Sequence, residues 1–98
     1  MERLPIEEGR VVRSLQGRDC GRCFVVLSCE ADGYVRYADG LTRKLDHPKK
    51  KKVKHIRPKP LRMDLNGSFP SGRLQDSDLR TFLRENGCGL EQPLCKED

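Results

Sequence analysis

Residues 23–29, with the sequence CFVVLSC, form a nearly continuous apolar run that decides the fold class of this chain. Side chains alternate between the two sides of a sheet, so a strand that is apolar at successive positions must be covered on both faces. The run is too short for a convincing independent helix. We therefore predict that residues 23–29 form the central strand of a small sheet.

Short strands are predicted on either side of this run. Residues 10–14 (RVVRS) follow a glycine and place Val11 and Val12 on opposite faces, and residues 34–38 (YVRYA) follow the hairpin signal ADG with Val35 and Tyr37 on one face. Asp39 begins a second turn, residues 41–45 are expected to form another strand, and residues 53–56 a closing one. This spacing predicts a mainly β protein built as a small antiparallel barrel or sandwich.

The second part of the chain is expected to be a linker followed by one helix. Residues 58–73 contain three prolines and two glycines, which is typical of a linker. Leu79, Phe82 and Leu83 then fall at helical spacing, after acidic residues suited to a helix start and before Asn86, which suits its end. We expect a basic domain over residues 1–60, and over residues 61–98 a linker, a C-terminal helix and a tail whose sequence shows no periodicity. The apolar stripe of the helix could pack on the barrel or contact a protein partner.

Positive charge is concentrated in the first part of this 98-residue chain, whose net charge is +5. Nine lysines and arginines between Arg43 and Lys59 face a single acid, Asp46, which is the pattern of a polyanion-binding site. Because like charges repel, residues 49–52 (KKKK) are expected to form a solvated loop. Only three Phe, two Tyr and no Trp are present, so base stacking can contribute little and electrostatics should dominate binding.

The five cysteines leave three alternatives open. An odd number cannot pair completely within the chain, and with neither an apolar membrane segment nor a secretory signal we expect a cytoplasmic protein with free thiols. Cys20 and Cys23 are spaced as half of a zinc site, which other cysteines or histidines would have to complete. Cys23 and Cys29 could instead be small residues that line a strand while Cys20 fills a loop position, or Cys20 could be a reactive thiolate that switches binding, favoured by nearby arginines.

Residues 9–26 (GRVVRSLQGRDCGRCFVV) resemble the KOW motif, a strand, glycine loop and second strand found in ribosomal proteins and transcription elongation factors. The resemblance continues through YVRYADG at 34–40, RKL at 43–45 and PKKKKVKH at 48–55, and covers about residues 8–58. In these respects the chain is similar to KOW-class large-subunit ribosomal proteins of eukaryotes and archaea. The resemblance implies an SH3-like barrel that touches RNA through its loops. Cys20 and Cys23 depart from the family pattern, so a role for them lies outside what the resemblance supports.

The expected function is non-enzymatic RNA binding, with ribosomal RNA or the ribosome as the partner and translation as the context. We expect no membrane partner, no cofactor and no metal. Catalysis is not expected either, because no histidine in the basic region has the acid and nucleophile neighbours of a catalytic site. The alternatives are a KOW-type protein-interaction module of the transcription machinery and a thiol-switched binder that uses Cys20 and Cys23. The residues expected to contact RNA are Arg18, Arg22, Arg43, Lys44, Lys49, Lys50, Lys51, Lys52, Lys54, His55 and Arg57.

Overall fold

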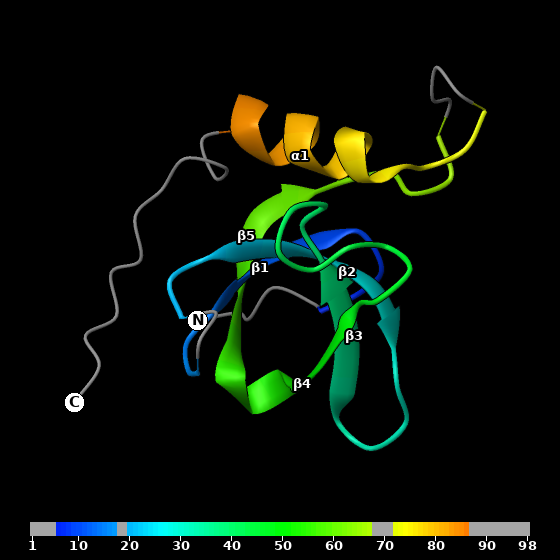
Figure 1. Cartoon of the computed structure of the whole chain (residues 1–98). Coiled ribbons are helices and arrows are strands. Elements are labelled where there is room, and N and C mark those ends of the chain that lie inside the picture. The colour runs from blue at the N-terminus through cyan, green and yellow to red at the C-terminus, as the bar shows by residue number, and fades with distance from the viewer. Residues whose placement is uncertain (1–5, 18–19, 68–71, 87–98) are drawn as a thin grey trace.

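The part of the chain that the structure describes folds as one antiparallel five-stranded sheet with one helix lying against it (Figure 1). The computed structural model describes residues 6–17, 20–67 and 72–86. The elements are β1 (Arg10–Ser14), β2 (Cys23–Cys29), β3 (Tyr34–Ala38), β4 (Lys49–Lys52), the 3-10 turn η1 (Val53–His55), β5 (Ile56–Arg62) and α1 (Asp76–Glu85). The strands lie in the order β4-β3-β2-β1-β5, and η1 links the two at opposite ends of that order. This path gives a small β-barrel-like fold, so the predicted mainly β fold is confirmed.

The central strands are covered on both faces, as their apolar sequences predicted. Val12 of β1 and Phe24 and Val26 of β2 are buried inside the barrel together with Val35, Tyr37 and Ile56. The rings of Phe24 and Tyr37 stack there with centroids 4.1 Å apart. Val11 and Val25 lie on the opposite face of the same strands, in a second buried cluster.

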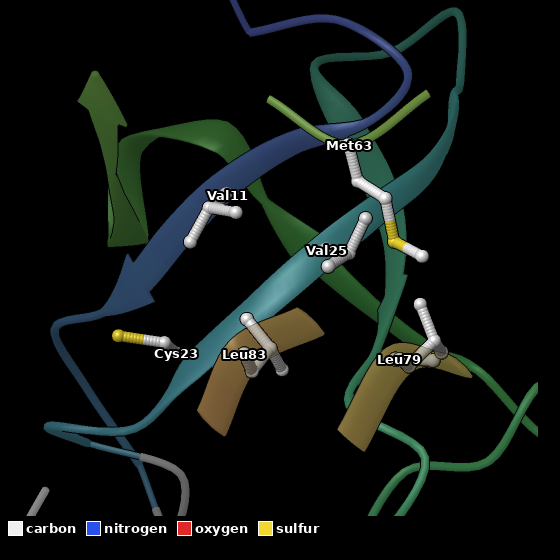
Figure 2. Packing of buried hydrophobic residues seen from close by; sticks show 7 residues of the cluster. Val11, Cys23, Val25, Met63, Leu79 and Leu83 are labelled. Carbon is white, nitrogen blue, oxygen red and sulfur yellow. The ribbon is translucent and has the colours of Figure 1, made fainter. Parts of the chain in front are cut away.

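Helix α1 covers this second face. Leu79 and Leu83 are buried against Val25 and its neighbours, and Met63, which follows β5, fills the same layer (Figure 2). The helix begins with a capping box in which Gln75 and Asp78 exchange hydrogen bonds between side chain and backbone. The predicted helix is thus confirmed, and its apolar stripe is buried within the chain's own core.

The lysine run forms a strand, so the expectation of a solvated loop at residues 49–52 was wrong. β4 pairs with β3 over its whole length, with Tyr34 opposite Lys52 and Tyr37 opposite Lys49. Strand formation here is a tertiary effect, because hydrogen bonding to the backbone of β3 outweighs the repulsion among neighbouring lysines.

Residues 41–45, expected to be a strand, form a loop instead. The Asp39 carboxylate accepts hydrogen bonds from the backbone N–H groups of Leu41, Thr42 and Arg43 at 2.8–2.9 Å. A side chain that occupies three consecutive donors leaves none of them for a strand partner, which fixes this turn.

The linker starts later than residues 58–73 suggested. β5 runs through two prolines to Arg62 and pairs with β1, and Met63 is only 5% exposed. Prolines are tolerated in β5 because it lies at one end of the strand order, where a strand has one side without a hydrogen-bonded neighbour. The tail at residues 88–98 lies outside the described residues.

Candidate nucleic-acid interface

Strand β4 presents two lysines on the outer surface of the barrel. Lys50 lies opposite Arg36 and Lys52 opposite Tyr34, and directly paired residues of antiparallel strands project from the same face. Lys50 and Lys52 are exposed, whereas Arg36 forms an ion pair with Glu30 at 3.2 Å. The charge of Arg36 is therefore already balanced within the chain.

The ring of Tyr34 lies close to both of these lysines. The Nζ atom of Lys50 is 4.9 Å from the ring centroid and that of Lys52 is 6.0 Å away, distances at which an ammonium is attracted to the face of an aromatic ring. These contacts gather two cations and one aromatic side chain on a single patch of sheet.

Lys51 projects the other way and joins β4 to the glycine loop between β1 and β2. Its ammonium donates a hydrogen bond to the Gln16 carbonyl at 2.8 Å, and the Leu15 N–H donates to the His55 carbonyl at 2.9 Å. These contacts bring together segments that are 35 or more residues apart in the sequence. The described part of the loop therefore lies beside β4 and η1, whose side chains supply the basic residues of this surface.

His55 lies within this surface and responds to its charge. Partial burial, followed by the positive charges of Lys54, Lys51 and Lys52, lowers the pKa of His55 below its usual range. The imidazole is therefore neutral in the unbound protein at neutral pH and becomes easier to protonate when an anion neutralises the lysines around it.

The other expected RNA contacts divide between two ends of the barrel. Ser14 donates a backbone hydrogen bond to Arg22 and pairs with Ile56, so Arg22 and Arg57 lie at the same end as His55. Arg43 and Lys44 lie in the loop before β4, which is fastened to the start of α1 by a hydrogen bond from the Leu45 N–H to Asp76. Lys49 begins β4 on that side. Arg18 lies outside the described residues.

Several lysines of this surface have no acidic partner. Among the residues that the structure describes, no carboxylate forms an ion pair with Lys50, Lys52 or Lys54. All three are exposed, so their charges are available to an external anion. We refer to Lys50, Lys52 and Lys54 as the free lysine triad.

The sequence did not identify Tyr34 as a site residue. Its proximity to the lysines depends on the register of β4 against β3, and that strand was expected to be a loop. The only signal in the sequence was the low aromatic content itself, which makes an aromatic residue outside the core unusual in this chain.

The expectation that the cysteines are free thiols is wrong for Cys20. Cys20 is disulfide-bonded, whereas Cys23 and Cys29 are not part of a disulfide. As a disulfide sulfur, Cys20 supplies neither a thiolate nucleophile nor a zinc ligand in this state. Cys23 is only 4% exposed and lies in the buried cluster between the sheet and α1. No group of three or more potential metal ligands occurs in the described part of the chain.

Comparison with known proteins gives no family for this chain. No protein-family model matches it, and a search of curated proteins returned no significant match. Within the described residues, no helix has the length and apolar character needed to cross a bilayer.

Proposed function

We propose that this protein binds RNA without catalysing a reaction, through the surface formed by β4, η1 and the β1–β2 glycine loop. The observation that carries the proposal is the free lysine triad, whose charges are exposed and lack acidic partners. Lysines that neutralise phosphates release condensed counterions, which favours binding to a polyanion.

The barrel strengthens this interaction by fixing where the charges lie. Four consecutive lysines in a flexible segment would spread apart, whereas pairing with β3 holds Lys49–Lys52 in a defined register. The hydrogen bond from Lys51 to Gln16 places the glycine loop beside them. The KOW resemblance of residues 9–26, together with the SH3-like strand order, supports RNA as the polyanion and ribosomal RNA as its source.

The decisive experiment compares two variants that change net charge equally. Lys52→Ser/Lys54→Ser removes two charges from the triad, and Thr81→Glu/Arg84→Ser lowers net charge by two on the exposed side of α1. We expect the first variant to bind RNA more weakly, with a log–log salt slope shallower by about 1.4 at ~0.7 per phosphate contact. The α1 variant should keep the slope of the original protein.

Binding is measured by fluorescence anisotropy over a series of salt concentrations, and circular dichroism verifies that both variants are folded. Equal affinities and slopes for the two variants would show that the triad is not the binding surface. No RNA binding by the original protein at low salt would remove the proposal altogether.

No observation favours the protein-interaction alternative to the same degree. Leu79 and Leu83, which the sequence offered as a partner surface, are buried within the chain.

A further inference from the structure

Tyr34 is an aromatic residue that the protein does not use in either core. Both buried clusters and the partly buried side chains packed against them omit it, whereas Tyr37, three residues later on the same strand, is fully buried. Within the described residues the Tyr34 hydroxyl makes no hydrogen bond. A half-buried ring on the outside of a sheet, with an unused hydroxyl, is not explained by packing.

The surroundings of Tyr34 supply what a nucleotide needs. A base requires an aromatic face on which to stack, and its flanking phosphates require cations close to that face. Lys50 and Lys52 provide those cations, 4.9 and 6.0 Å from the ring centroid and without carboxylate partners.

The lysine that lies over the ring does not block it permanently. An exposed lysine held only by a ring gains about 0.5–1 kcal/mol from the contact, whereas hydrogen bonds between ionised partners are about twice as strong as neutral ones. A phosphate beside Tyr34 can therefore draw the ammonium of Lys50 off the ring and open the face to a base.

From this arrangement we propose that Tyr34 stacks on one unpaired base while Lys50 and Lys52 bind the flanking phosphates, so that the protein prefers RNA with an unpaired segment. This inference rests on the proposed RNA-binding function and adds the class of RNA. In a duplex the bases are stacked on one another inside the helix, so their faces are not available to the ring of Tyr34.

A purely structural role for Tyr34 makes a different prediction. If the ring serves only to anchor the lysines of β4 by cation–π contacts, its removal lowers stability and weakens the binding of every polyanion together. A stacking role instead weakens the binding of unpaired RNA alone, because duplex RNA and polyphosphate offer no accessible base.

The experiment uses the full chain, with Tyr34→Leu to remove the aromatic face and Tyr34→Phe as the matched control that keeps it. The ligands are a short uridine oligonucleotide, a blunt-ended RNA duplex and inorganic polyphosphate. We expect Tyr34→Leu to lose about tenfold in affinity for the oligonucleotide, within the ~1–3 kcal/mol that base stacking contributes. Its affinities for the duplex and for polyphosphate should stay within about twofold of the original, on the premise that only unpaired bases reach the ring. Tyr34→Phe should bind all three ligands as the original protein does.

A direct readout is the NMR signal of the Tyr34 ring protons. Stacking of a base should shift them upfield when the oligonucleotide binds, and polyphosphate should not. If Tyr34→Leu weakens all three ligands equally, or none, the stacking inference is wrong while RNA binding stands. If the original protein binds none of the RNAs, both the proposed function and the inference fail.

Discussion

Replacing Gly9 by alanine should destabilise the protein far more than the same replacement at Gly33. Both glycines have positive φ angles, +88° and +76°, which cost an alanine about 1–2 kcal/mol in either position. They differ in their surroundings. A Cβ atom on Gly9 would lie 2.1 Å from the Met63 carbonyl oxygen, whereas one on Gly33 meets nothing within 4 Å.

The size of the difference follows from what must move at Gly9. Its N–H donates to the Val26 carbonyl at 2.8 Å and its carbonyl accepts from the Met63 N–H at 2.7 Å, so Gly9 ties β2 to the end of β5. Each such bond contributes about 0.5–1.5 kcal/mol. Moving Met63 would also open the buried cluster that lies between the sheet and α1. We expect Gly33→Ala to lower the free energy of unfolding by about 1 kcal/mol. The loss for Gly9→Ala should be at least about 3 kcal/mol, a large part of the ~5–15 kcal/mol typical of a folded domain.

Urea unfolding followed by circular dichroism, without reductant so that the Cys20 disulfide is kept, measures both values. Equal losses for the two variants would show that the close approach of Gly9 to Met63 does not constrain the fold. A larger loss for Gly33→Ala would contradict the reasoning entirely.

Three further predictions concern the helix, the histidine and the thiols. Leu79→Ala should cost about 2–5 kcal/mol in urea unfolding, because Leu79 is fully buried, whereas exposed Thr81→Ala on the same helix should change stability by less than about 0.5 kcal/mol. An NMR titration should find the pKa of His55 below its usual range. The contribution of His55 to stability is therefore complete above about pH 6.5 and is lost as pH falls. Bound RNA should raise this pKa, and an unchanged pKa on binding would place His55 outside the interface. Burial and the nearby Glu8 and Glu7 raise the pKa of Cys29, so peptide mapping after thiol labelling at neutral pH should show slow modification of Cys29 although it is exposed. Rapid labelling of Cys29 would show that burial and the two glutamates do not suppress its thiolate.

The sequence was a good guide where the local pattern and the tertiary structure agree. β1, β2, β3 and α1 were predicted with their faces because each has an apolar periodicity that matches its environment. The glycine loop and the turn at Asp39 were also recognisable from residue type alone, although the three hydrogen bonds that Asp39 accepts were not.

The failures have a common physical cause. β4 consists of lysines alone, and five of the seven residues of β5 are prolines, arginines or lysine, whose intrinsic preferences oppose strand formation. Both segments are strands because neighbouring strands supply their hydrogen bonds. The site was affected in the same way. Its lysines were identified from composition, but the relation of Tyr34 to Lys50 and Lys52 depends on the pairing register, which composition does not contain.

The two-sided burial of β1 and β2 restricts where this protein can change. Val11, Val12, Phe24 and Val25 leave no water-facing position in the middle of the sheet, so nearly any polar replacement there would unfold the chain. β4 has a free outer surface, and its side chains can be exchanged without disturbing either apolar layer. A descendant of this protein could therefore acquire a new ligand by altering its lysine strand and loops, while the interior stays the same.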